Sequence, residues 1–220
     1  RRVLLVDDHP IVRSGLAQMI AREEDLMVCG QAEGCSDADI LLPKTRPDIV
    51  LVDLTLQDGN GLEMIKNWRA QEHRVPVLVL SMHDERLYAE RALRAGAQGY
   101  IMKEEPPDKI IAAIREVLQG GVYLTSSLAG QLMPVGQARR AARPARIGMD
   151  RLSDRELEIF EMLGAGKSAT HIAGQLGLSV KTVETHRLHI KQKLNVNTAN
   201  DLLHLAIRWH EAPCSAAPPD

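Results

Sequence analysis

Residues 49–53 read Ile-Val-Leu-Val-Asp, a run of four apolar side chains that ends on a carboxylate. Three other stretches in the first half of the chain repeat this pattern and end on groups that suit phosphoryl chemistry: residues 3–8 on Asp7 and Asp8, residues 77–81 on Ser81, and residues 99–103 on Lys103. Continuous apolar runs of this length are typical of strands buried on both faces, as in a parallel sheet covered by helices.

The carboxyl ends of parallel strands meet at one edge of a sheet, where open α/β sheets place their sites. We therefore expect these five polar side chains to converge. A carboxylate can act as a nucleophile toward phosphorus, and adjacent carboxylates can hold Mg²⁺. An ammonium and a hydroxyl can bind phosphoryl oxygens. Each residue alone is explained equally well as a helix cap or an ordinary strand end, but their combination favours a site that forms an acyl phosphate.

The same half of the chain alternates five strands with five helices, the second strand being near Met27–Ala32. The helices are predicted at Pro10–Arg22, Ser36–Lys44, Gly61–Ala70, Asp84–Ala95 and Pro107–Leu118. This alternation predicts an α/β fold with a five-stranded, doubly wound parallel sheet and right-handed crossovers.

Residues 1–120 resemble the receiver domain of response regulators, a flavodoxin-like fold. The resemblance is carried by the acidic pair Asp7-Asp8, by Asp53, by Ser81, and by Tyr100 three residues before Lys103. It implies that Asp53 is phosphorylated by a sensor histidine kinase or a small phosphodonor. It also implies that Asp8, Asp53 and the backbone carbonyl of Thr55 ligate Mg²⁺ (or Mn²⁺), with Asp7 completing the acidic pocket, and that Ser81 and Tyr100 move together when phosphate is bound.

Length and composition agree with two small domains. The 220 residues exceed one typical domain, and the net charge is −5 over residues 1–120 but +3 over residues 121–220. A basic second half hints at a polyanionic partner. No apolar run approaches the roughly 18 residues of a membrane span, and no signal peptide is recognisable, so we expect a cytoplasmic protein. The three cysteines follow no metal-binding spacing and are expected to be free thiols.

Residues 121–149 read as a basic, flexible linker with room for one short helix at Ser127–Met133. Its arginines, Arg139, Arg140, Arg143 and Arg146, either belong to a solvated spacer or contact DNA phosphates, and the sequence leaves both open. The Pro- and Ala-rich tail 211–220 is expected to be disordered.

Residues 150–210 predict four short helices. Ser153 and Glu156 form a capping box before a helix at 154–163. Ser168 caps a helix at 169–176, which Gly177 ends, and Ser179 caps a longer one at 180–194. A last helix begins at Thr198 or Asn200 and reaches Trp209. The middle pair has the size of a helix-turn-helix.

At about 100° per residue, Val183, Ile190 and Leu194 form the core stripe of the longer helix. Lys181, Thr185, Leu188 and Gln192 lie opposite, where they suit either a DNA major groove or solvent. His186 lies nearer the core stripe, which favours half-buried packing over base contact.

A second resemblance favours DNA. Residues 152–156, 172–173, 179–186 and 193–194 resemble a LuxR-type helix-turn-helix, and the whole chain is similar to response regulators of the NarL/FixJ class. The resemblance implies double-stranded DNA as a partner and a homodimer when the protein is phosphorylated or bound to DNA. The residues that it assigns to DNA are Lys181, Thr182, Glu184, Thr185 and Leu188, with phosphate contacts from neighbours such as Lys191.

The last predicted helix is apolar nearly all round, so one stripe packs on its own domain and leaves Leu203, Ile207 or a neighbour for a partner subunit. The sequence thus predicts a phosphorylation-controlled DNA-binding transcription regulator, not an enzyme. Two other functions stay open. A phosphatase using Asp53 as nucleophile needs a nearby general acid, and Thr55 stands where one is expected. The other is a protein-interaction adaptor, whose second domain binds a partner protein and no DNA. Such an adaptor would not retain genomic DNA fragments in a gel shift.

Overall fold

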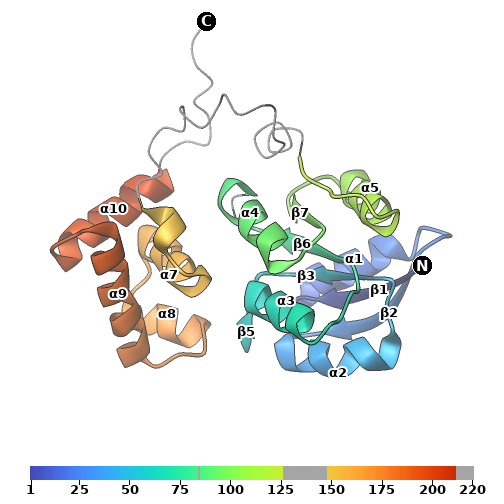
Figure 1. Cartoon of the computed structure of the whole chain (residues 1–220), viewed down its shortest axis with the longest axis horizontal. Helices are drawn as coiled ribbons and strands as arrows, with labels where there is room; N and C mark the ends of the chain where they lie inside the picture. Colours follow the sequence, from blue (N-terminus) through green and yellow to red (C-terminus); the bar gives the residue numbers. More distant parts are fainter. Residues whose placement is uncertain (84, 126–147, 212–220) are drawn as a thin grey trace, which may run out of the picture. The chain divides into compact units, whose positions relative to one another are not determined.

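The computed structural model describes residues 1–83, 85–125 and 148–211. Its chain divides into two compact units, Arg1–Gln137 and Ala138–Asp220 (Figure 1). The predicted short helix at residues 127–133 and the tail beyond residue 211 lie outside the described residues, as does most of the predicted linker. Within the described ranges, no helix combines the length and the apolar character needed to cross a membrane.

The first unit is a five-stranded, wholly parallel sheet in the order β2-β1-β3-β6-β7. The strands are β1 (Arg2–Val6), β2 (Met27–Ala32), β3 (Ile49–Val52), β6 (Val77–Ser81) and β7 (Gly99–Met102). The predicted α/β fold with a flavodoxin-like, doubly wound sheet is confirmed. A short antiparallel pair, β4 (Thr55–Leu56) and β5 (Gly59–Asn60), follows Asp53 and was not predicted.

Helices cover both faces of this sheet (Figure 1). They are α1 (Pro10–Ile20), α2 (Cys35–Thr45), α3 (Gly61–Ala70), α4 (Glu85–Ala95) and α5 (Pro107–Leu118). On one face, alternate strand residues such as Val3, Leu51 and Leu80 form a core with side chains of α1 and α5. The intervening strand residues are buried as well, on the face that α2, α3 and α4 cover. Two-sided burial explains why these strands show continuous apolar runs.

The first unit extends slightly past residue 120. The backbone N–H of Tyr100 donates to the carbonyl of Tyr123 at 3.1 Å, and Tyr123 forms a parallel bridge with Gly99. Tyr123 therefore contacts the edge strand β7.

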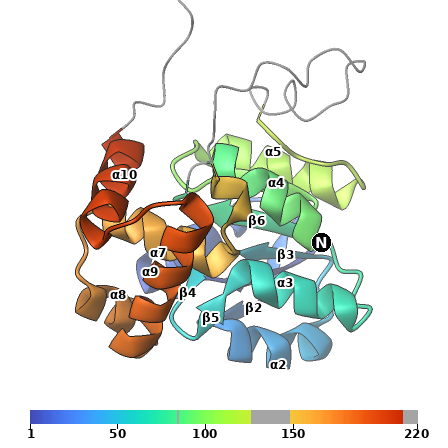
Figure 2. The same ribbon diagram turned by 60° about the vertical axis from the view of Figure 1, so that its left-hand side comes forward.

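In the described part of the second unit, residues 148–211, the structure shows a 3₁₀ turn, η1 (Met149–Arg151), and four helices: α7 (Asp154–Gly164), α8 (Ala169–Gln175), α9 (Val180–Leu194) and α10 (Ala199–Glu211). All three predicted serine caps are present: Ser153 forms the capping box with Glu156, Ser168 accepts from His171 N, and Ser179 accepts from Thr182 N. Gly177 has φ +61° and allows the tight turn by which α8 and α9 lie side by side (Figure 2). The all-α, four-helix prediction is confirmed.

Candidate functional site

The predicted polar residues converge at the carboxyl edge of the sheet. The register pairs Val6 with Val52, which sets Asp7 beside Asp53 at adjacent strand ends. Lys103 Nζ lies 2.6 Å from Asp53 Oδ2 and 2.7 Å from Asp7 Oδ2. All three side chains are at least nine-tenths buried. One ammonium therefore bridges two buried carboxylates.

Burial and pairing act in opposite directions on these groups. Burial raises the pKa of Asp53 above its usual range, and the charge of Lys103 with its hydrogen bond offsets only part of this effect. Burial alone would lower the pKa of Lys103, but the charge of Asp53 and hydrogen bonds to Asp53 and Asp7 raise it. Lys103 is therefore held as a cation inside the pocket.

The donor set in this pocket suits a hard divalent cation. Asp7, Asp8, His9 and Asp53 each offer a ligand atom, all within 4.8 Å of one another. Asp8 Oδ1 is buried and accepts no hydrogen bond within the described residues, although His9 Nδ1 lies 2.7 Å away. The backbone of Thr55 lies close enough to the Asp53 carboxylate to act toward a lower pKa of this group, which places the Thr55 backbone beside the pocket. An unsatisfied carboxylate oxygen among three acids fits a Mg²⁺ site, and His9 is a neighbour that the sequence reasoning missed.

Ser81 and Tyr100 are both fully buried and are connected through His83. The His83 N–H donates to Ser81 Oγ at 3.2 Å, and the Tyr100 hydroxyl donates to the His83 carbonyl at 2.7 Å. The His83 ring lies against Tyr88, and its Nε2 is 2.8 Å from Thr55 Oγ1. His83 was not among the predicted site residues, although its place two residues after Ser81 could have drawn attention to it.

The loop after Asp53 forms hydrogen bonds at the starts of two helices. The carboxylate of Asp58 accepts hydrogen bonds from the N–H groups of Cys35 and Ser36 at the start of α2. Asn60 caps α3, and the N–H of Gly61 donates to the Leu54 carbonyl at 2.8 Å. The loop that follows Asp53 is therefore held at the starts of α2 and α3 by these hydrogen bonds.

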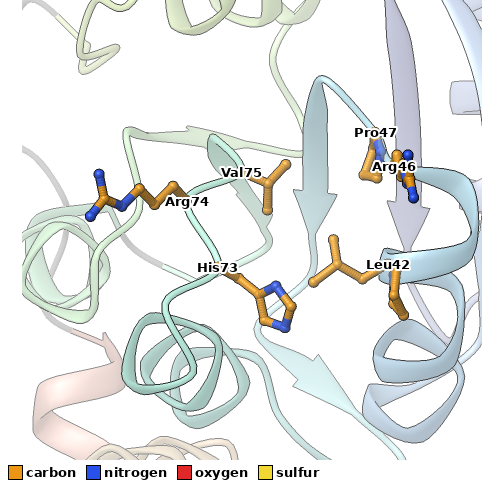
Figure 3. A pocket seen from close by; sticks show the side chains of 7 residues that line it. Leu42, Arg46, Pro47, His73, Arg74 and Val75 are labelled. Carbon is orange, nitrogen blue, oxygen red and sulfur yellow. The ribbon is translucent and has the colours of Figure 1, made fainter.

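A cavity of about 350 Å³ lies elsewhere in the first unit. Its lining comes from the end of α2 and from the loop before β6: Leu42, Pro43, Arg46, Pro47, His73, Arg74 and Val75 (Figure 3). These segments precede β3 and β6, so the cavity lies at the amino ends of the strands, opposite the acidic pocket. None of the predicted site residues lines it.

In the second unit, α9 has the predicted two faces. Val183, Ile190 and Leu194 are buried, and the outward residues Lys181, Thr185, Leu188 and Gln192 are exposed, Leu188 by 51%. His186 is half-buried, as predicted. Several outward side chains already have local partners: Thr182 Oγ1 is 2.8 Å from Ser179 Oγ, Thr185 Oγ1 donates to the Lys181 carbonyl, and Glu184 pairs with Arg187. The ammonium of Lys181, in contrast, has no partner in the part of the chain that the structure describes.

The apolar residues of α10 divide as expected. Leu202 and Ala206 are buried against the second unit, whereas Leu203 and Ile207 stay partly exposed. The approach of α7 to α10 is close, because a Cβ on Gly164 would lie 2.5 Å from the Ala206 carbonyl oxygen. This packing fixes which stripe of α10 faces outward.

Comparisons with known proteins agree with this geometry. The sequence model of the response regulator receiver domain matches residues 3–115, and that of the luxR family of bacterial regulatory proteins matches residues 150–206. Transcriptional regulatory protein UhpA of Salmonella typhimurium is 37% identical over 202 residues, 92% of this chain and 95% of its own. Response regulator UvrY of Escherichia coli is 34% identical over 206 residues, 94% of this chain and 93% of its own. The solved structure of response regulator ChrA, from a heme-sensing two-component system, is 30% identical and covers 94% of this chain and 96% of its own, with a TM-score of 0.51.

A parallel α/β domain with an acidic pocket and a buried lysine, joined to a helix-turn-helix domain, defines a two-component response regulator that binds DNA. The chain belongs to the response regulators that combine a receiver domain with a LuxR-type DNA-binding domain, the NarL/FixJ class. This family consists of transcription regulators rather than enzymes.

Proposed function

We propose that Asp53 accepts a phosphoryl group from a sensor histidine kinase in the cytoplasm, and that the acyl phosphate controls dimerisation and DNA binding. The observation that carries this proposal is the ammonium of Lys103 bridging the buried carboxylates of Asp53 and Asp7, beside an Asp8 oxygen that accepts no hydrogen bond in the described residues. The carboxylates of such a pocket can bind a cation, and its ammonium can bind the oxygens of a phosphoryl group. Binding of either one changes the charge of the pocket.

In this mechanism a carboxylate oxygen of Asp53 attacks phosphorus and the donor leaves from the opposite side. Asp8, Asp53 and the Thr55 carbonyl would hold Mg²⁺ (or Mn²⁺), with Asp7 nearby, and the ion would neutralise charge on the phosphoryl oxygens. The ammonium of Lys103 exchanges its hydrogen bond to Asp53 for one to a phosphoryl oxygen. Ser81 Oγ donates to another.

The response to phosphate follows from the contacts of His83. When Ser81 turns toward the phosphoryl group, its Oγ no longer accepts from the His83 N–H, and the hydrogen bond from the Tyr100 hydroxyl to the His83 carbonyl is disturbed with it. Ser81 and Tyr100 would thus move as a pair. The shift in population that they produce favours the form that dimerises and binds DNA.

The outward face of α9 is the proposed DNA-reading surface. Lys181 suits guanine acceptors because its ammonium lacks a partner within the described residues, and the exposed Leu188 suits a thymine methyl. Thr182 and Thr185 can contact DNA once their local hydrogen bonds are exchanged. Glu184 would accept from a cytosine amine after leaving Arg187, and Lys191 would contact phosphate.

The dimer is proposed to form through Leu203 and Ile207, the partly exposed apolar residues of α10. A two-fold arrangement would place two α9 helices in half-sites about one helical turn apart on double-stranded DNA.

The experiment that tests the proposal compares wild type with Asp53→Asn after incubation with Mg²⁺ and a small phosphodonor. Intact mass should show one added phosphoryl group on wild type and none on the variant. On a sizing column only phosphorylated wild type should shift to a dimer, and Leu203→Glu should stay monomeric although phosphorylated. Phosphorylation of Asp53→Asn, or equal affinity of both proteins for a selected DNA site, would contradict the proposal.

Substituting Lys181 by alanine should reduce the discrimination between a selected DNA site and a random duplex by about 1–3 kcal/mol, the value of one good base contact. Competition gel shifts at fixed salt measure it, since phosphate contacts depend strongly on ionic strength. Lys167→Ala, an exposed lysine outside α9, is the control and should keep the wild-type discrimination. A uniform loss of affinity on both duplexes would assign Lys181 to the DNA backbone instead.

A further inference from the structure

A second cluster of metal-ligating side chains lies in the DNA-binding unit, between α7 and α9. Glu156 of α7 and His186 and His189 of α9 each offer one ligand atom, and these atoms lie within 4.8 Å of one another. The two histidines are three residues apart, so they project from the same side of the helix. They belong to the flank of α9 and not to its outward face.

All three side chains retain unused lone pairs. Glu156 accepts from Ser153 N at 2.7 Å and from Lys193 Nζ at 2.6 Å, and in the described part of the chain both hydrogen bonds end on Oε2. Its Oε1 therefore remains available. His186 Nδ1 is buried and has no partner in the described residues, and the His189 ring makes no hydrogen bond to any of them. A buried ring nitrogen without a partner carries a desolvation cost that a metal ion would remove.

We propose that Glu156, His186 and His189 bind one Zn²⁺, with water as the fourth ligand. Two imidazoles and one carboxylate form a recognised set of zinc ligands with an open fourth position. Mg²⁺ prefers oxygen ligands and does not compete well for imidazole.

Two adjustments complete the site. The three ligand atoms lie within 4.8 Å of one another, and Zn²⁺ bonds of about 2.0–2.1 Å require them to be closer together. A small rotation of the exposed His189 side chain brings its ring nitrogen closer to the other two ligand atoms. Lys193 leaves Glu156 and turns to solvent, which its 39% exposure permits. The ion then supplies the positive charge beside the carboxylate, and it links the start of α7 to the middle of α9.

The test uses the full chain, freed of metal with a chelator and kept in excess Mg²⁺ so that the acidic pocket around Asp53 is filled. Titration with Zn²⁺ by calorimetry should show one ion per chain, and Co²⁺ should give the visible absorption of a tetrahedral site. His189→Asn should weaken binding by at least about 10–100-fold, the loss seen when even an outer partner of a metal site is removed. His204→Asn, an exposed histidine of α10, is the matched control and should bind as wild type does.

A loss of Zn²⁺ binding in His189→Asn can be attributed to the lost ligand and not to unfolding, because His189 is exposed and its substitution does not disturb the core. Equal Zn²⁺ binding by wild type and His189→Asn, or no binding by either, would overturn the inference. Binding that persists in His189→Asn but disappears in Asp8→Asn would place the ion in the receiver and would overturn it as well. None of these results bears on the phosphorylation of Asp53, so the two proposals stand or fall separately.

Discussion

Replacing Gly61 by alanine is expected to lower the free energy of unfolding of the receiver by about 3 kcal/mol, at the upper end of overpacking costs. A Cβ at this position would lie 2.3 Å from the carbonyl oxygen of Asp53 and 3.0 Å from the Cα of Leu54. Both obstacles are backbone atoms, which cannot turn aside as a flexible side chain can. The strand end that carries Asp53 must therefore move, and the rate of phosphorylation should fall together with stability.

Chemical denaturation measures the stability change, and intact mass over time measures phosphorylation. Gly15→Ala is the matched control. Gly15 lies in α1 of the same unit, is exposed, and has no heavy atom within 4 Å of the place where a Cβ would be. Alanine there should raise stability by up to about 1 kcal/mol through helix propensity. A Gly61→Ala protein as stable as wild type would show that the loop after Asp53 tolerates displacement.

The fold and the positions of most residues of the candidate site could be predicted because the informative patterns are local. Two-sided burial leaves continuous apolar runs such as residues 49–52, and a strand end fixes where the next polar residue lies. Serine caps such as Ser153 and Ser179 are equally local, because each bonds an N–H only three residues away. Convergence of Asp7, Asp53 and Lys103 then follows from the parallel sheet alone.

Contacts between distant segments could not be predicted where the strand order of the parallel sheet does not itself dictate them. The hydrogen bond between His83 and Thr55 joins the loop after β6 to β4, and its partners are 28 residues apart. The close contact of Gly164 with Ala206 depends on how α10 packs on α7, which no local pattern encodes. His189 looked like an ordinary polar residue on one flank of α9, since nothing in the sequence places Glu156 beside it.

Replacing Lys103 by methionine is expected to lower the free energy of unfolding at neutral pH by about 3–5 kcal/mol in the presence of a chelator. This is the usual cost of removing one partner from a buried ion pair, because Asp7 and Asp53 would face each other in the pocket without a cation. Lys109→Met is the control: its ammonium pairs with Glu105 at the surface, where pairing contributes little. A loss below about 1 kcal/mol for Lys103→Met would mean that water already screens the two carboxylates.

The dependence of the stability of Lys103→Met on pH and on Mg²⁺ distinguishes an effect of charge from an effect of packing. Burial raises the pKa of Asp53, and the substitution removes the cation that holds it down. A carboxyl group whose pKa is higher in the folded than in the unfolded state destabilises the fold above that pKa, and the penalty disappears as the pH falls toward the unfolded value near 3.9. The loss of stability in Lys103→Met should therefore shrink on acidification, and Mg²⁺ should reduce it at neutral pH by replacing the lost charge.

The double variant Asp53→Asn/Lys103→Met should recover about 1–2 kcal/mol of the lost free energy of unfolding, as expected for directly coupled residues. If it recovers nothing, the methionine harms packing rather than electrostatics.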